Sequence, residues 1–201
     1  QKMANPNMGN LKPIDDDLKN RMLQFEIDCD DGNGNAYACH SVAEFKSMFD
    51  GNYKEAANIL TKNCDGKNNY GASCFKLGRY LLKGQGVEQN DVLALKRFEK
   101  GCDRGISPAC HFLGMMLLED TVNKDPPRAL KAFQKACSDG DQESCFHLGK
   151  QYLSGGEAVL GQRNPKLASE SLIKACDAGH APSCRLLAVL YRNGDTGVRQ
   201  D

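Results

Sequence analysis

The chain has 201 residues, of which 40% are apolar and 26% are charged. Its 26 basic and 26 acidic residues balance, which argues against nucleic acid or an anionic membrane as the main partner. No apolar run approaches the roughly 18 to 20 residues that span a bilayer, so the sequence predicts no membrane span. Residues 1–13 are polar and rich in Asn, and we interpret them as a tail without the features of a secretory signal.

Ten cysteines fall into five close pairs, one pair in every 35 to 39 residues. The pairs are Cys29/Cys39, Cys64/Cys74, Cys102/Cys110, Cys137/Cys145 and Cys176/Cys184. A period of this length is typical of stacked supersecondary units, because each unit buries its apolar face only against a neighbour. We therefore predict one array of about five repeats over 14–198, with 199–201 as the truncated start of a further helix.

The residues around each cysteine pair recur at helical spacing. An apolar residue stands four positions before the first cysteine, and alanine stands eight before it in four of the five copies. After the second cysteine, an apolar residue stands at the third position and a small one at the fourth: Ala43, Gly78, Gly114, Gly149 and Ala188. These spacings lie on one helix face. Because glycine inside a helix costs roughly 1 kcal/mol against alanine, its recurrence indicates close helix contact.

The predicted elements are all helices. A first helix ends at Cys29 and is followed by alternating A and B helices at 37–49 (A), 53–65 (B), 72–83 (A), 91–103 (B), 108–119 (A), 126–138 (B), 143–154 (A), 165–177 (B) and 182–193 (A). Polar, turn-forming connections separate them, and the longest runs over 154–164. The fold class is therefore all-α, an α-solenoid of αα-hairpin repeats.

Local disulfides are the interpretation that we favour for the cysteines. Polar segments that contain glycine separate the members of most pairs, so one cysteine ends a helix and the other begins the next. A short loop then brings the two within bonding distance. Reduced core cysteines, a metal site and a twin C-x9-C hairpin are the alternatives. Disulfides would place the protein in an oxidising compartment, whether secretory lumen, periplasm or mitochondrial intermembrane space.

The segment YLLKGQGVEQND at 80–91, followed by Ala94, Phe98 and Cys102, resembles the Sel-one-like repeat, a relative of the tetratricopeptide repeat. Weaker copies extend across 37–198. The cysteine pairs resemble those of two groups: secreted bacterial cysteine-rich repeat proteins, and animal cytochrome c oxidase assembly factors of the mitochondrial intermembrane space. The segments 53–64 and 73–78 resemble the second group.

The second resemblance implies a non-enzymatic scaffold of the intermembrane space. It would act in cytochrome c oxidase (complex IV) assembly or as an associated respiratory-chain component. Its expected partners are respiratory-chain subunits or assembly factors and the oxidative import machinery. Solenoids bind partners along a concave face, and we expect the A helices to line it. The candidate partner-binding residues are Lys76, Arg79, Phe112, Met115, Met116, His147, Lys150 and Gln151.

Enzymatic alternatives have little support in the sequence. The first resemblance implies a secreted or periplasmic protein with penicillin-binding or β-lactamase-like activity, and Ser171 to Lys174 does spell S-x-x-K. The companion S-D-N and K-T-G elements are absent. Thiol oxidoreductase activity would require a strained or exposed pair, whereas five equivalent pairs indicate structural bonds. We therefore predict no catalytic residues.

A haem or copper handling role is the remaining alternative. His111 and His147 are the candidate ligands, but they stand one and two positions after their cysteines and are expected to point in different directions. The C-x-x-C-H motif is absent. The prediction is therefore no metal and no cofactor, with haem as the open possibility.

Overall fold

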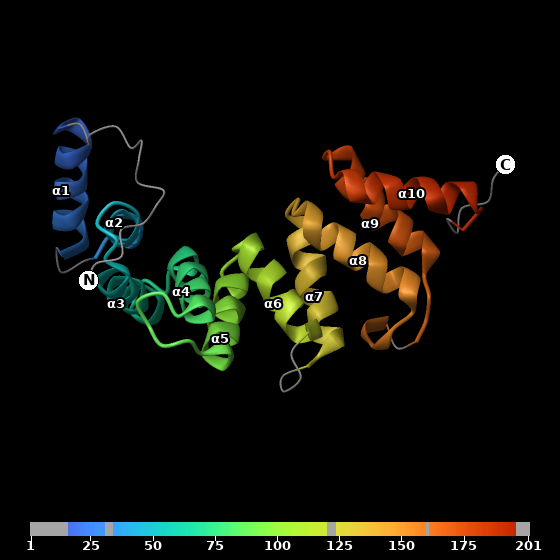
Figure 1. Cartoon of the computed structure of the whole chain (residues 1–201), viewed down its shortest axis with the longest axis horizontal. Coiled ribbons are helices and arrows are strands. Elements are labelled where there is room, and N and C mark those ends of the chain that lie inside the picture. The colour runs from blue at the N-terminus through green and yellow to red at the C-terminus, as the bar shows by residue number, and fades with distance from the viewer. Residues whose placement is uncertain (1–15, 31–33, 120–123, 160, 196–201) are drawn as a thin grey trace, which may run out of the picture.

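The computed structural model describes residues 16–30, 34–119, 124–159 and 161–195. The predicted tail, 1–13, and the segment 199–201 lie outside these ranges. Within them every element is a helix (Figure 1). The elements are α1 (Asp16–Asp30), α2 (Ala36–Met48), α3 (Tyr53–Asp65), α4 (Gly71–Lys83), α5 (Asp91–Asp103), α6 (Ser107–Glu119), α7 (Pro126–Ser138), α8 (Gln142–Ser154), the 3-10 helix η1 (Glu157–Val159), α9 (Pro165–Asp177) and α10 (Ala181–Arg192).

The predicted α-helix boundaries agree with these bounds to within one residue, and the all-α fold is confirmed. The A helices are α2, α4, α6, α8 and α10, and the B helices are α1, α3, α5, α7 and α9. The short helix η1 lies in the long connection between α8 and α9. Its Ala158 is buried and η1 contacts α7, so this connection is packed against the array.

Polar residues in the connections determine where the B helices begin. The side chains of Asn52, Asn90, Asp125 and Asn164 each accept a hydrogen bond from the backbone amide three residues further on, in α3, α5, α7 and α9. These bonds satisfy amides that lack a partner inside the helix. Two A helices end on a left-handed glycine, Gly84 after α4 and Gly155 after α8.

Small residues allow each A helix to pack closely on the following B helix. A Cβ atom added at Gly78 would lie 2.8 Å from Phe98 Cε1, and one at Gly114 would lie 2.7 Å from Phe133 Cε1. At Gly149 the corresponding distance to Leu172 Cγ is 2.7 Å. The close contact that the recurring glycines predict is therefore present, with a ring or a leucine seated directly on the A-helix backbone.

Five disulfides join the helix ends at the B-to-A connections. The bonds are Cys29–Cys39, Cys64–Cys74, Cys102–Cys110, Cys137–Cys145 and Cys176–Cys184, with Cα–Cα distances of 4.5 to 4.9 Å. These distances fall in the usual range for a disulfide. The bonds at the centre of the array are buried, whereas Cys176 and Cys184 are only half-buried.

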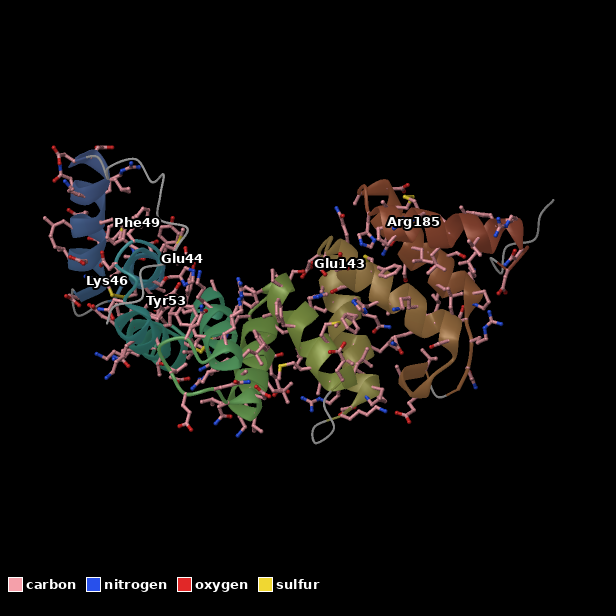
Figure 2. The ribbon with its side chains drawn as sticks, in the orientation of Figure 1. Glu44, Lys46, Phe49, Tyr53, Glu143 and Arg185 are labelled. Carbon is pink, nitrogen blue, oxygen red and sulfur yellow. A yellow bond between two sulfur atoms is a disulfide. The ribbon has the colours of Figure 1, made fainter. Side chains whose placement is uncertain are left out.

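The repeats follow one another along a curved array, with α1 at one end and α10 at the other (Figure 1). Glu44 on α2, Glu143 on α8 and Arg185 on α10 lie along the inner side of the curve (Figure 2). A helices therefore contribute side chains to the inner side, where a solenoid offers an extended surface to a partner.

Candidate partner-binding surface

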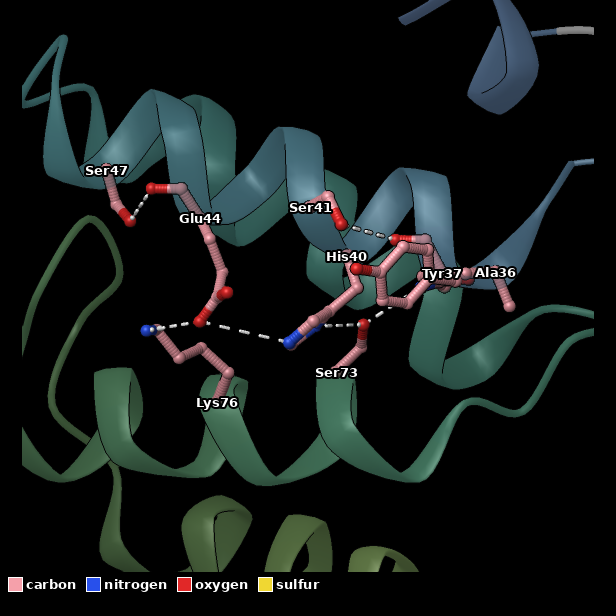
Figure 3. Close-up of polar contacts among 9 residues, drawn as sticks. Ala36, Tyr37, His40, Ser41, Glu44, Ser47, Ser73 and Lys76 are labelled. Atoms are coloured by element: carbon pink, nitrogen blue, oxygen red, sulfur yellow. Dashed lines mark hydrogen bonds and ion pairs between the residues drawn. The ribbon is translucent and has the colours of Figure 1, made fainter. Parts of the chain in front are cut away.

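Polar contacts connect the first two A helices. His40 Nδ1 on α2 lies 3.0 Å from Ser73 Oγ on α4, and Lys76 Nζ lies 2.9 Å from Glu44 Oε1 (Figure 3). The buried amide of Asn63 on α3 donates to Ser73 Oγ at 2.9 Å and to the Ala36 carbonyl at 2.8 Å. Burial lowers the pKa of His40, against the opposing effect of the Glu44 carboxylate. This network holds α2, α3 and α4 together.

The same contact recurs two repeats later. His111 Nδ1 on α6 lies 3.0 Å from Ser144 Oγ on α8 and 3.3 Å from Asp141 Oδ2. At the next connection, His180 Nδ1 lies 2.7 Å from Ser183 Oγ, and its Nε2 lies 3.2 Å from Glu143 Oε1. Three of the four histidines of the chain therefore join neighbouring repeats through serine and carboxylate partners.

Charged residues connect the B helices in a similar way. Arg97 on α5 forms an ion pair with Asp65 on α3, and Lys100 Nζ lies 3.3 Å from the same carboxylate. Burial alone would raise the pKa of Asp65, but the hydrogen bonds and charges of Arg97 and Lys100 hold it below its ordinary value. Arg128 on α7 pairs with Glu99 on α5 at 2.5 Å. Each of these ion pairs joins a B helix to the B helix of the preceding repeat.

Several predicted partner-binding residues are engaged inside the array. Lys76 is paired with Glu44 as described, and the Arg79 guanidinium lies 5.9 Å above the Phe75 ring. Lys150 Nζ lies 5.5 Å above the Phe146 ring. His147 stacks on Phe133 with centroids 5.2 Å apart. Gln151 is half-buried, and its carbonyl accepts bonds from Ser154 and Gly155. These residues do not converge on one site.

Phe112, Met115 and Met116 do converge. They line a cavity of about 560 Å³ on α6, together with Leu82 from α4, Asp91 from α5, and His111 and Glu119. A cavity of this size lies within the range of ligand sites in proteins. Leu82, Asp91 and Glu119 were not predicted as members of this site. Aligning the A helices on their cysteines would have shown α6 as unusually apolar, but not the contribution of α4 and α5.

The structure corrects one expectation about the histidines. Instead of pointing apart, the rings of His111 and His147 are neighbours with centroids 5.8 Å apart. Burial lowers the pKa of His147, and the nearby His111 and Lys150 act in the same direction. In the part of the chain that the structure describes, no group of three His, Cys, Asp or Glu side chains is placed to hold a metal ion.

The S-x-x-K match falls inside α9. Ser171 is buried, and its hydroxyl donates to the Leu167 carbonyl at 2.8 Å, while Lys174 is exposed. A serine nucleophile needs a hydrogen-bonded base within reach. The Ser171 hydroxyl is instead used within its own helix, so this match does not form a catalytic pair in the structure.

Comparison with known families agrees with the repeat architecture. The model of the Sel1 repeat matches residues 71–106, 107–141, 142–180 and 181–201. The chain belongs to the Sel1 repeat family. These four Sel1 matches cover most of the array and include the whole of α4 to α10.

Curated relatives of this Sel1 repeat chain include cytochrome c oxidase assembly factor 7 from Xenopus tropicalis and from Homo sapiens. The frog protein is 36% identical over 94 residues, 44% of this chain and 40% of the relative. The human protein is 29% identical over 121 residues, 55% of this chain and 51% of the relative. The matched stretches thus span about half the length of these relatives or less.

Two solved Sel1-type structures share the fold. A Sel1 repeat protein from Oxalobacter formigenes superposes with a TM-score of 0.78 at 21% identity, over 92% of this chain and 77% of that one. The antigen c5321 of uropathogenic Escherichia coli gives a TM-score of 0.72 at 22% identity, over 85% of this chain and 36% of that one. None of the helices in the described ranges has the length and the apolar composition of a membrane span.

Proposed function

We propose that this Sel1 repeat protein is a non-enzymatic scaffold that acts in the assembly of cytochrome c oxidase in the mitochondrial intermembrane space. The observation that carries the proposal is the similarity to curated relatives named cytochrome c oxidase assembly factor 7, at 36% identity over 94 residues in the frog protein. An array of helical hairpins gives such a protein an extended surface for respiratory-chain subunits or assembly factors.

The cysteines support the proposed compartment. All ten are paired, and none is left as a free thiol. Disulfides persist where the environment is oxidising and are rare where thioredoxin and glutathione keep thiols reduced. The intermembrane space meets this requirement, and the oxidative import machinery there would introduce the bonds after entry of the reduced chain. The chemistry of the bonds and the similarity to the assembly factors both support the proposed location.

Depletion and rescue in cells of the source organism test this function. We expect depletion to lower the amount of assembled oxidase on native gels while other respiratory complexes remain. Re-expression of the wild-type chain should restore it, and protease should reach the protein only after the outer mitochondrial membrane is opened. Recovery from the secreted fraction, or an unchanged oxidase level on depletion, would contradict the proposal. Stable co-purification with the mature oxidase would identify a resident component.

A further inference from the structure

The A helix α6 differs from its two neighbours at equivalent positions. At the second, fifth and sixth positions after the cysteine, α4 has Lys76, Arg79 and Tyr80, α8 has His147, Lys150 and Gln151, and α6 has Phe112, Met115 and Met116. The array packs with charged side chains at the fifth position in α4 and α8. Packing alone therefore does not require an apolar residue at Met115, and the apolar surface of α6 calls for a separate explanation.

The cavity on α6 combines a rigid wall with adaptable sides. Phe112 stacks on the buried Phe98 with centroids 5.2 Å apart and meets Phe75 edge-on at 5.7 Å. These contacts hold the ring in place. Met115 and Met116 are half-buried and line the same cavity. Unbranched thioether side chains adjust to different apolar partners, which is why methionine is common on surfaces that bind helices.

The charged residues of this cavity are acidic. Asp91 at the start of α5 and Glu119 at the end of α6 line it, and both are exposed. Neither carboxylate forms an ion pair with a cation among the described residues, and Asp91 has only a 3.5 Å contact with the Gln89 amide. By contrast, Asp65, Glu99 and Glu44 are each paired with a lysine or arginine. Two unpaired carboxylates beside an apolar cavity favour a partner with positive charge next to its apolar residues.

We propose that this α6 cavity binds an amphipathic helix of a partner protein, whose apolar side chains enter between Phe112, Met115 and Met116 and whose flanking lysines or arginines face Asp91 and Glu119. This proposal rests on the scaffold function proposed above and adds the chemistry of the partner. Within this chain, α1 exposes Leu23 and Ile27 but carries five acidic and two basic residues, so α1 of a second copy lacks the charge that the cavity favours. Binding by another helix of a second copy is an outcome of the experiments below.

Peptide titration tests the proposal directly. The probe is a synthetic amphipathic helical peptide with leucines at positions i, i+3, i+4 and i+7 and lysines beside them; a matched peptide has glutamates in place of the lysines. We expect the lysine peptide to bind the oxidised protein and the glutamate peptide to bind at least tenfold more weakly. Equal binding of both peptides, or binding of neither, would overturn the proposal.

Single substitutions then test whether the lysine peptide binds at the cavity on α6. Met116→Lys should weaken binding of the lysine peptide at least tenfold, whereas Leu167→Lys should leave it within twofold. Leu167 is an exposed leucine on α9, 37% accessible, and lies outside the cavity. The double variant Asp91→Asn, Glu119→Gln should bind more weakly and lose much of the salt dependence. Circular dichroism confirms that each variant is folded, and equal weakening by Met116→Lys and Leu167→Lys would contradict the assignment.

Rescue in depleted cells separates this inference from the proposed function. If the wild-type chain restores oxidase assembly and Met116→Lys does not, while both accumulate equally, the cavity is the partner site. If Met116→Lys restores assembly fully, the scaffold function stands and the cavity proposal fails. If depletion does not affect the oxidase at all, the proposed function itself fails, and the peptide data alone then judge the cavity. Self-association that Met116→Lys abolishes would identify a second copy as the occupant and overturn the proposal.

Discussion

At the scale of the residue, one small side chain per repeat decides how closely two helices approach. Gly78, Gly114 and Gly149 each face a large side chain of the next B helix. In the first A helix the equivalent position is Ala43, and Leu60 stands at the equivalent position of the next B helix; both are fully buried. Alanine thus occurs in the copy whose next B helix has leucine at this position, whereas two of the glycines face phenylalanine rings.

Replacing Gly114 by alanine should therefore destabilise the protein. Alanine gains about 1 kcal/mol in helix propensity, but its Cβ would lie 2.7 Å from the Phe133 ring. Overpacking of this kind typically costs about 1 to 3 kcal/mol. We expect a net loss in the free energy of unfolding measured with urea. The loss should be smaller in a Phe133→Leu background, and a stabilising Gly114→Ala would show that the helices can separate without penalty.

His147 should make stability depend on pH. Burial lowers its pKa in the folded state, with His111 and Lys150 acting the same way and Glu143 and Glu119 opposing. The folded state then binds fewer protons than the unfolded state, whose histidine pKa is near 6.5. Stability from this group is therefore present above about pH 6.5 and is lost as the pH falls through the folded-state pKa.

Substitution of His147 by phenylalanine tests this dependence with little change in packing. In the preceding repeat, Phe112 stacks on Phe98 at 5.2 Å, the same centroid distance as between His147 and Phe133. Between pH 7.5 and 5, the variant should lose less stability than the wild type in urea unfolding. Parallel pH curves for the two proteins would assign the acid sensitivity to other groups, such as His40.

At the scale of the element, the polar caps define the B helices. Asn90 accepts a bond from the Leu93 amide at 2.8 Å, and Asn164 accepts one from Leu167 at 3.0 Å. Each cap ends a polar connection and begins a helix that ends near a cysteine. The length of every B helix is 13 residues from α3 to α9. Cap and cysteine thus limit each helix at opposite ends.

The substitution Asn90→Ala, which removes the cap, should lower the free energy of unfolding by about 1 kcal/mol. Asn90→Gly should lower it by only about a few tenths of that amount. The reason is that the Leu93 amide loses its acceptor in the alanine variant, while glycine leaves room for water. Urea unfolding measures both, and Gln89→Ala, an exposed neighbour, is the control. Equal effects for Gln89→Ala and Asn90→Ala would mean that the cap bond contributes nothing to stability.

At the scale of the whole molecule, the strong contacts join helices that are neighbours in the chain, and the buried core runs along the array from α2 to α9. From α3 to α9, each B helix packs between the A helices before and after it, and ion pairs such as that of Arg97 with Asp65 join one repeat to the next. In such arrays stability is approximately the sum of repeat and neighbour terms. A central repeat contributes two interfaces, and a terminal one contributes a single interface.

Removal of a central disulfide should therefore destabilise the protein more than removal of the last one. The bonds Cys102–Cys110 and Cys176–Cys184 both span eight positions, so their loop-closure terms are equal, at about 2.5 kcal/mol in the chain-entropy model. We expect the serine pair at Cys102 and Cys110 to lose more stability, and the pair at Cys176 and Cys184 to raise hydrogen exchange only in α9 and α10. Equal losses with uniform exchange would indicate a single cooperative unit.

The sequence by itself determined the helices, their boundaries and the cysteine pairs. These features depend on residues close in the chain: caps such as Asn90, stripes with a spacing of four, and cysteines at either end of a short loop. The sequence also predicted the close packing of helices at the recurring glycines, because each repeat has the same local register. Local spacing is sufficient for such features since the geometry of a helical hairpin varies little.

Only the tertiary structure decided which side chains meet across repeats. Asp91 and Leu82 line the cavity on α6 from two other helices, and the His111 and His147 rings come within 5.8 Å despite different positions relative to their cysteines. The rotation between successive repeats determines which of these side chains come into contact. That rotation arises from the sum of the contacts over the whole interface between two repeats. No short motif encodes that rotation, so the side chains that form the cavity could be assembled only from the packed array.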